Sequence, residues 1–227
     1  MNKEYWEKNI QKWSKLYLDI SHADEKFGCP GFVERIYHAL ITPIERSLMK
    51  KRYHKTIAYF DAYVKPGTVV ADLGCGSGIF TVELLRRGAE VRAVDFTQAS
   101  LEMTRQLVAS QCPELIDRVQ YFQMDITQQM IPRCDAAFAM GVTPYVEDIE
   151  TFYDNVLPQT QVFYCQMVDP TSPANLLRRA LPMLNVRRLR FHHKRRLDAI
   201  YKKHRWTLKR REIFATGYID LAEVGAH

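Results

Sequence analysis

The stretch VVADLGCGSG, residues 69–78, decides how this chain folds. Its apolar first half predicts a buried strand over residues 68–73, and its glycines predict a tight turn into a helix over residues 79–87. A strand, glycine turn and helix in this order present backbone N–H groups at the carboxyl edge of a sheet. Glycine suits the turn because no Cβ keeps a ligand away from the backbone. We therefore expect this turn to bind a ligand that carries negative charge or carbonyl-type acceptors.

The spacing of the turn narrows the choice of ligand. Residues 72–78 read Asp-x-Gly-x-Gly-x-Gly, whereas the NAD/FAD fingerprint needs a glycine at position 79, which here is Ile79. Asp95 follows the next predicted strand and is placed to accept both hydroxyls of an adenosine ribose. Asp125 follows the strand after that. Because such strand ends share one sheet edge, the sequence predicts glycine amides, a ribose acceptor and an acceptor for an adenine amine side by side.

The rest of the pattern alternates between short strands and helices, which predicts a parallel sheet with helices on both faces. The last two predicted strands are joined by residues 215–217, a turn too short for a parallel crossover, so this pair must be antiparallel. We expect a doubly wound, mostly parallel α/β sheet of seven strands with an antiparallel last strand. Strands are predicted at 68–73, 90–94, 119–124, 136–140, 161–168, 206–214 and 217–223, and helices at 79–87, 97–110 and 149–156, with a helical, basic region at 172–204.

Before residue 65 the pattern is helical. Helices are predicted at about 1–20, 32–40 and 44–63, and we expect residues 1–64 to form a helical cap on a single domain of residues 65–227. The first helix carries an aromatic stripe that either closes over the cofactor and substrate as a lid or packs as ordinary core: Tyr5, Trp6, Trp13 and Tyr17.

Composition bounds the class of protein. A chain of 227 residues with 47% hydrophobic residues is globular rather than disordered. The cysteines show no C-x-x-C or Cys/His spacing, so we predict no metal site and no disulfide framework: Cys29, Cys75, Cys112, Cys134 and Cys165. The N-terminus has no apolar signal core, and no run reaches the roughly 18 apolar residues of a membrane span. We therefore expect a soluble, cytoplasmic protein.

Four segments in order, VVADLGCGSG, VRAVDF, FQMDIT and CDAAFAMGV, resemble the cofactor motifs of class I S-adenosylmethionine-dependent methyltransferases. The resemblance covers residues 68–168 well, extends to the basic helix and strand pair at the end, and is weaker over residues 1–60. It implies S-adenosylmethionine as cofactor, S-adenosylhomocysteine as product and methyl transfer as activity. The ending, residues 191–218, is loosely similar to the magnesium-protoporphyrin and quinone branch of small-molecule methyltransferases.

The resemblance also implies roles for single residues. Asp95 would hold the ribose, with Phe96 beside the adenine, and Asp125 would accept from the adenine amine, with Ile126 against the ring. Asp95 has a second interpretation as an N-cap of the following helix. Asp72 would fix the loop or hold the cofactor's amino group. The remaining cofactor residues are the methionine and ribose contacts and one lid residue: Gly74, Cys75, Gly76, Gly78, Met140 and Tyr17.

The segment after the fourth strand bears on the methyl acceptor. Methyltransferases of nucleobase amines carry an Asp/Asn-Pro-Pro-Tyr-like motif here, whereas this chain has Gly141-Val142-Thr143-Pro144-Tyr145. The acidic or amide residue that would bind the amine is missing. The sequence therefore argues against a nucleobase N-methyltransferase.

A hydroxyl acceptor needs a base, and two histidines are candidates. His192 and His193 precede a helix whose N-terminus should lie at the carboxyl edge, where it lowers the pKa of an imidazole. His193 shares a helical face with Leu197, so it is equally open to a packing role. Tyr145 and Asp169, both at strand ends, are further candidates.

The charge of the chain is local. Residues 187–211 hold twelve Lys/Arg and one acid, a net charge of +11, so the rest of the chain carries −5 of the total of +6. This segment reads as a solvated helix face, as a phosphate-binding face for RNA, or as a face for anionic lipid. The favoured function is methyl transfer to a small molecule, most readily at oxygen. An RNA or protein methyltransferase and a non-catalytic cofactor-binding scaffold are the alternatives, and the sequence gives no oligomeric state.

Overall fold

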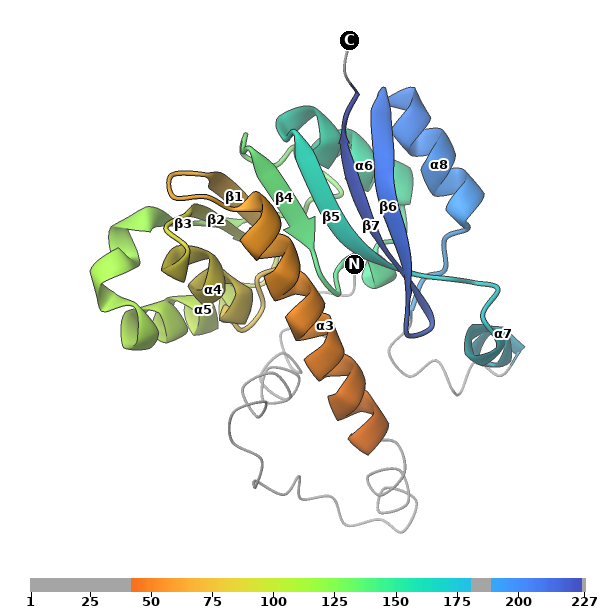
Figure 1. The fold of residues 1–227 in the computed structure, drawn as a ribbon, viewed down its shortest axis with the longest axis horizontal. Helices are drawn as coiled ribbons and strands as arrows, with labels where there is room; N and C mark the ends of the chain where they lie inside the picture. The colour runs from red at the N-terminus through yellow and green to blue at the C-terminus, as the bar shows by residue number, and fades with distance from the viewer. Residues whose placement is uncertain (1–41, 181–188, 226–227) are drawn as a thin grey trace.

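The computed structural model describes residues 42–180 and 189–225. This part of the chain forms one seven-stranded sheet of order β3-β2-β1-β4-β5-β7-β6 (Figure 1). β7 pairs antiparallel with both β5 and β6, and the other pairings are parallel. The strands are β1 Val69–Leu73, β2 Glu90–Asp95, β3 Val119–Gln123, β4 Ala136–Ala139, β5 Val162–Val168, β6 Trp206–Phe214 and β7 Gly217–Val224.

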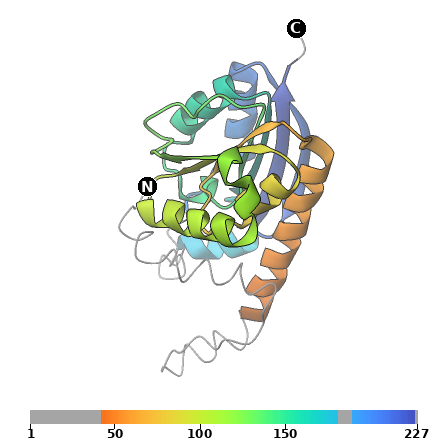
Figure 2. The same cartoon turned by 90° about the vertical axis from the view of Figure 1, so that its left-hand side faces the viewer.

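Helices cover both faces of the sheet. Apolar residues of α3, α4 and α5 pack in one core with one face, and those of α6 and α8 pack in a second core with the other. The side view in Figure 2 shows this layering, with α3 in orange on one side and α6 and α8 in teal and blue on the other. The helices are α3 Thr42–Tyr63, α4 Ile79–Arg86, α5 Gln98–Gln111, α6 Ile149–Val156, α7 Pro173–Ala180 and α8 Lys194–Lys203, with short 3-10 turns at Pro113–Arg118, Thr143–Tyr145 and Leu157–Gln159.

Local signals explain where the main helices begin. The Thr97 side chain accepts a hydrogen bond from the Ser100 N–H and so caps α5, as its place before the helix predicts. Asp148 caps α6 in the same way through the Thr151 N–H. These caps fix the start of each helix directly after a strand or loop at the carboxyl edge, where the pocket described below lies.

The predicted fold class is confirmed, and each predicted strand ends within about one residue of its observed end. The predicted helix at 149–156 and the antiparallel pair at the end are confirmed as well. The prediction of a helical region over 172–204 is wrong for residues 189–193, which are not helical between α7 and α8. The predicted helices at 1–20 and 32–40, and the lid that they would form, lie outside the described residues.

The third predicted N-terminal helix is confirmed as α3, which belongs to the core of the sheet domain. Its Phe60 is fully buried and meets the Phe138 ring of β4 edge-on at 4.9 Å. The division into a cap of residues 1–64 and a domain of residues 65–227 stays a prediction.

Two further expectations concern cysteines and membrane spans. The four cysteines within the described residues, Cys75, Cys112, Cys134 and Cys165, are free and buried, as expected for small apolar side chains. Within the same residues, no helix has the length and apolar character that crossing a membrane requires. The described residues also hold no group of three or more His, Cys, Asp or Glu side chains that could bind a metal ion.

Candidate functional site

The glycine turn after β1 is held against the end of β2. The N–H groups of Gly74 and Cys75 both donate to the Val94 carbonyl, at 2.7 and 3.1 Å. Gly78 begins α4 at a φ of +82°, and a Cβ there would lie 2.8 Å from the Cα of Thr104 in α5. Glycine is therefore needed at position 78 both for the left-handed backbone and for the close approach of two helices.

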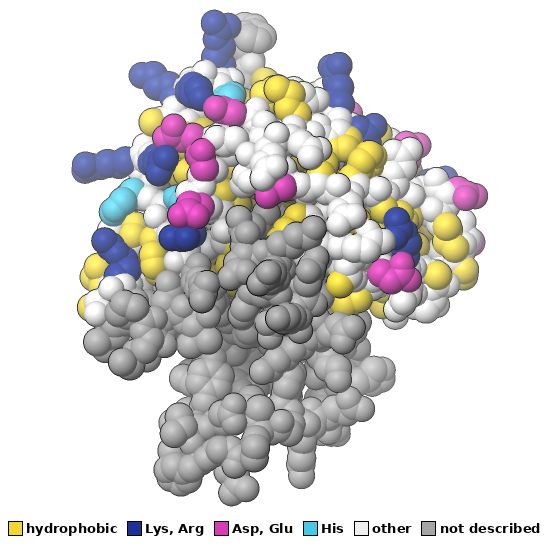
Figure 3. Space-filling view, turned by 180° about the vertical axis from the view of Figure 1, so that it is seen from behind, with side chains coloured by type: hydrophobic (Ala, Val, Ile, Leu, Met, Phe, Trp, Pro, Cys, Tyr) yellow, Lys and Arg dark blue, Asp and Glu magenta, His cyan; other side chains and the backbone are white. Residues whose placement is uncertain are grey.

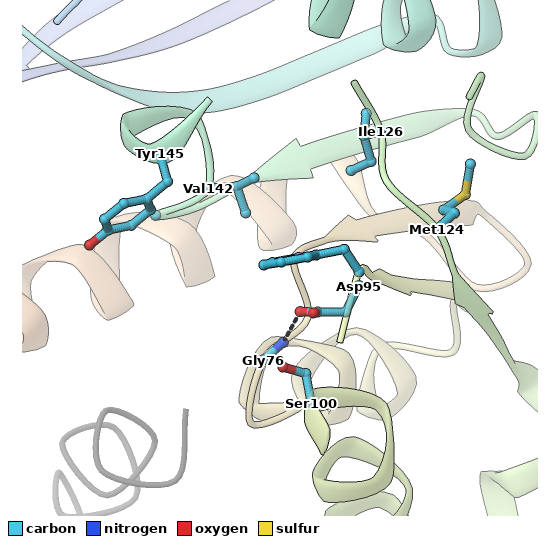
Figure 4. Close-up of a pocket in the computed structure, with 10 residues that line it drawn as sticks. Gly76, Asp95, Ser100, Met124, Ile126, Val142 and Tyr145 are labelled. Atoms are coloured by element: carbon cyan, nitrogen blue, oxygen red, sulfur yellow. Dashed lines mark hydrogen bonds between the residues drawn. The ribbon is translucent and has the colours of Figure 1, made fainter. Parts of the chain in front are cut away.

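Asp95, the last residue of β2, faces this turn. Its Oδ2 accepts a hydrogen bond from the Gly76 N–H at 3.2 Å, drawn as the dashed line in Figure 4. Its Oδ1 accepts from the N–H and Oγ1–H of Thr97, at 2.9 and 3.0 Å. Thr97, rather than Asp95, is therefore the N-cap of α5. Burial raises the pKa of the Asp95 carboxyl, against the hydrogen bonds from Thr97 and Gly76 that lower it.

A pocket opens at this edge, where the ends of β1, β2 and β4 meet the segment after β3. It holds about 530 Å³ of empty space, which includes space open to solvent. In Figure 4, Ile126 and Val142 lie above Asp95, and Tyr145 and Met124 lie on opposite sides of it. The lining residues are Gly74, Gly76, Asp95, Phe96, Ser100, Met124, Ile126, Gly141, Val142 and Tyr145.

Six of the residues predicted from the sequence thus line one pocket: Gly74, Gly76, Asp95, Phe96, Ile126 and Tyr145. Phe96 and Tyr145 are half-buried, which leaves part of each ring accessible, and Ile126 is buried. They come from four separate segments of the chain. Sequence reasoning that assigned strand ends to a single sheet edge therefore brought the right segments together, while their roles toward a ligand stay predictions.

The other predicted cofactor residues lie behind or beside this lining. Asp72 is buried under the turn, where Thr81 Oγ1 donates to it at 2.6 Å. Burial raises the pKa of Asp72 to about 7. Cys75 and Gly78 are buried, Met140 is buried at the end of β4, and Asp125 is half-buried, with Oδ1 accepting from Thr127. Tyr17 lies outside the described residues.

Four lining residues were not predicted: Ser100, Met124, Gly141 and Val142. The Val142 side chain lies directly against the turn. A Cβ on Gly74 would lie only 2.1 Å from Val142 Cγ2. Ser100 is the third residue after the cap Thr97, so the capping pattern was the one signal that could have placed it here. The gap in sequence between Gly74 and Val142 explains why spacing alone could not pair them.

Arg52 of α3 also reaches this edge, and no motif in the sequence marks it. Its Nη1 donates to Gln166 Oε1 of β5 at 3.0 Å, and its Nη2 lies 3.0 Å from Met49 Sδ. A Cβ added to Gly141 would lie 3.1 Å from Nη1. The guanidinium therefore sits directly against a residue that lines the pocket.

Residues 189–193 run beside the loop that carries Tyr145. The Arg190 N–H donates to the Pro144 carbonyl at 2.7 Å, and the Tyr218 hydroxyl donates to the His192 carbonyl at 3.0 Å. His192 Nε2 lies 3.0 Å from the Val146 carbonyl, so the ring N–H donates there and Nδ1 is the acceptor of the neutral ring. This strap holds the Tyr145 loop in place.

The two candidate histidines differ in their surroundings. His192 is buried, and burial lowers its pKa, against the Val146 bond that raises it. The neutral form is thus favoured, as predicted, but burial is the main cause rather than a helix N-terminus. His193 occupies the N-cap position of α8 and is exposed. The expectation that it packs against the sheet is therefore wrong.

Acidic neighbours neutralise much of the basic segment. Arg190, Arg196 and Lys203 pair with Glu147, Glu150 and Asp154 around α6, and Lys209, Arg210 and Arg211 pair with Glu223, Glu212 and the pair Asp198/Asp220. Arg211 binds the buried Asp220 through two hydrogen bonds of 2.7 Å. Among the described residues, six Lys/Arg side chains of the segment are thus compensated by acids, whereas Lys194 and Arg195 form no ion pair.

Comparison with known proteins relates part of this chain to methyltransferases. Residues 71–158 match the family model described as a methyltransferase domain. A solved structure of magnesium protoporphyrin IX methyltransferase from Synechocystis PCC 6803 with bound SAH superposes with a TM-score of 0.71, at 16% identity and with 97% of each chain covered. The fold and the resemblance to class I methyltransferases are thereby confirmed.

Curated relatives match over part of their length. Magnesium-protoporphyrin O-methyltransferase of Rhodobacter capsulatus is 36% identical over 35% of this chain and 34% of its own. Ubiquinone biosynthesis O-methyltransferase of Acinetobacter baylyi is 31% identical over 43% of each. Ribosomal protein L11 methyltransferase of Thermoanaerobacter pseudethanolicus is 24% identical over 59% of this chain and 43% of its own. The chain thus spans less than half the length of these relatives, whose names give different acceptors.

Proposed function

We propose that this chain, which has the fold of class I methyltransferases, transfers a methyl group from S-adenosylmethionine to an oxygen atom of a small molecule. The observation that carries the proposal is the buried Asp95 carboxylate at the end of β2, hydrogen-bonded to the Gly76 amide at the mouth of a pocket. The cytoplasmic location expected from the sequence is part of the proposal. The four free cysteines of the described residues suit a reducing compartment.

The lining of the pocket fits the chemistry of this cofactor. Asp95 supplies an acceptor for two ribose hydroxyls, and Phe96 and Ile126 supply apolar walls for an adenine, with Asp125 beside them for its amine. Arg52 sits against Gly141, which lines the pocket, and a planar cation there suits the methionine carboxylate. These groups would match the ribose, the adenine and the carboxylate of the cofactor.

The chain's own residues have two tasks in this reaction. S-adenosylmethionine supplies a methyl group on a sulfonium, so the protein must hold an acceptor in line with it and exclude water. Val142 and Tyr145 line the pocket, and we propose that they flank the acceptor. A hydroxyl acceptor must also lose a proton, and His192, buried behind the Tyr145 loop with a lowered pKa, is the base that we propose.

The choice of a small-molecule acceptor rests on two observations. Magnesium-protoporphyrin and ubiquinone O-methyltransferases are among the partial matches, which supports an oxygen acceptor. Six Lys/Arg side chains of the basic segment are held in ion pairs within the described residues, so these six give no support to an RNA substrate.

A screen of small hydroxyl and carboxylic acid compounds, read by release of S-adenosylhomocysteine, tests this proposal. We expect turnover with at least one oxygen acceptor. His192→Asn should lower kcat by about 10²- to 10⁴-fold with a smaller effect on KM, whereas His193→Asn should leave both unchanged. Methylation of an RNA or a protein in place of every small molecule would contradict the acceptor assignment, and full activity of His192→Asn would contradict the base.

A further inference from the structure

We propose that the corner formed by α7 and the tip of the β6–β7 hairpin docks on an anionic membrane surface. The inference goes beyond methyl transfer and does not depend on which acceptor is used.

The helix α7 turns a polar residue inward and apolar residues outward. Asn175 is fully buried, and its Nδ2 donates to the carbonyls of Asp169 and Thr216, both at 2.7 Å. Leu176 and Leu177 are 51% and 53% exposed. A surface helix normally packs its apolar side on the core and leaves its polar side in water. The two leucines therefore indicate a surface that another apolar medium covers.

The hairpin tip extends this apolar surface. Ile213, near the end of β6 and three residues before the turn residue Thr216, is 90% exposed. It is paired with Tyr218 of β7. The hydrogen bond from Asn175 to Thr216 ties α7 to this tip. Exposed aliphatic side chains thus project from two elements that are held together. The exposed apolar side chains named here are aliphatic, whereas stacking on nucleic-acid bases uses aromatic rings.

Cations flank the same corner. Lys194 and Arg195, the first residues of α8, are exposed and form no ion pair within the described residues. The pKa of the Asp169 carboxyl, which burial raises, is held below its usual value by bonds from Thr171 and by the charges of Lys194 and His193. Lys194 therefore lies close to the residue that leads into α7.

The view from behind shows the wider pattern (Figure 3). Lys and Arg side chains gather on the side where α8 lies, and both hydrophobic and acidic side chains lie among them. Aliphatic residues next to unpaired cations match the interface of an anionic bilayer, where apolar side chains enter the headgroup region and cations meet phosphate. This charge pattern is what favours a membrane over an uncharged protein partner.

The docking corner and the pocket share one edge of the sheet. α7 follows the end of β5, and the pocket lies at the ends of β1, β2 and β4, which run parallel to β5. Docking through α7 would therefore turn the pocket edge toward the bilayer. For the proposed methyl transfer, on which this last step rests, such an orientation suits an acceptor dissolved in lipid.

Co-sedimentation of the full chain with vesicles tests the proposal. We expect binding to vesicles of phosphatidylcholine mixed with phosphatidylglycerol, weaker binding to phosphatidylcholine alone, and release by salt. Replacing both leucines, Leu176→Ser with Leu177→Ser, should weaken binding by about tenfold or more. Met130→Ser is the matched control, because Met130 is 59% exposed on the loop before β4, away from this corner, and its loss should change nothing.

Several results would overturn the docking surface. These are no binding of the wild type to the mixed vesicles, equal binding of the double leucine variant, or a wild-type dimer in sedimentation velocity that the leucine variant abolishes. If the leucine variant does not fold, Lys194→Glu with Arg195→Glu must lose vesicle binding instead, and retained binding would refute the proposal. Calorimetry with S-adenosylmethionine separates the two proposals. If the wild type does not bind the cofactor, the proposed methyl transfer is refuted, whereas membrane docking is still judged by the vesicle result.

Discussion

Replacing Gly74 by alanine places a methyl group where the structure has no room for one. Gly74 has a φ of +72°, and its Cβ would lie 2.1 Å from Val142 Cγ2, whereas ordinary contact begins at 3.4 Å. The two atoms must therefore separate by a further 1.3 Å, the difference between these distances. The left-handed backbone costs an alanine about 1–2 kcal/mol, and such overpacking costs about 1–3 kcal/mol, so we expect a loss of roughly 2–5 kcal/mol.

The second variant of the experiment removes the obstacle. Val142→Ala deletes the Cγ2 that the new methyl group meets, so the double variant should keep only the backbone cost of about 1–2 kcal/mol beyond Val142→Ala itself. The cycle should give a favourable coupling of about 1–3 kcal/mol between the two substitutions. Gly67→Ala is the control, because Gly67 has a φ of +85° with nothing within 4 Å of its Cβ.

Urea unfolding of the four variants and the wild type measures these free energies, and calorimetry with S-adenosylmethionine supplies a second readout. Gly74→Ala should also weaken cofactor binding, since Gly74 and Val142 both line the pocket. The reasoning would be refuted if Gly74→Ala cost no more than Gly67→Ala, or if the effects of Gly74→Ala and Val142→Ala were simply additive.

Two predictions concern buried carboxyls. Because burial raises the folded-state pKa of Asp72 to about 7, its stabilising contribution is complete below the unfolded pKa and is lost as the pH rises through 7. Asp72→Asn should therefore flatten the fall in unfolding free energy between about pH 4 and pH 8 and add about 1–4 kcal/mol near pH 8; urea unfolding with the same pH slope as the wild type would argue against this. Arg211→Met should cost about 3–5 kcal/mol by leaving Asp220 buried without its cation, whereas Lys209→Met, which removes an exposed pair, should cost less than about 1 kcal/mol in the same assay. Equal losses for these two variants would contradict the assignment.

The fold could be predicted because its signals are local. The glycine turn, the strand-terminal acids and the short turn before Gly217 each depend on a few consecutive residues, and parallel topology then brings the strand ends to one edge. The helix predicted at about 149–156 has these bounds in the structure, where Asp148 caps it and buried apolar residues follow at helical spacing.

From the sequence, only those site residues that lie at strand ends or in the loops directly after them could be predicted. Arg52 meets Gly141 and Gln166 because α3 packs across the sheet, and such a contact between distant segments leaves no pattern in either one. The same reason applies to His192: it is buried in a segment whose Arg190 N–H donates to the Pro144 carbonyl, a contact that helical periodicity over 172–204 could not indicate. Tertiary packing, rather than local propensity, determines where the side chains of Arg52 and His192 lie.

The central claim is that Asp95 makes this pocket a site for S-adenosylmethionine. Calorimetric titration of the cofactor into the wild type and into Asp95→Ala tests it most directly. We predict saturable binding to the wild type and a loss of about 1–3 kcal/mol in Asp95→Ala, since the ribose hydroxyls lose a buried charged acceptor. No detectable binding to the wild type, or an unchanged affinity in Asp95→Ala, would contradict the account.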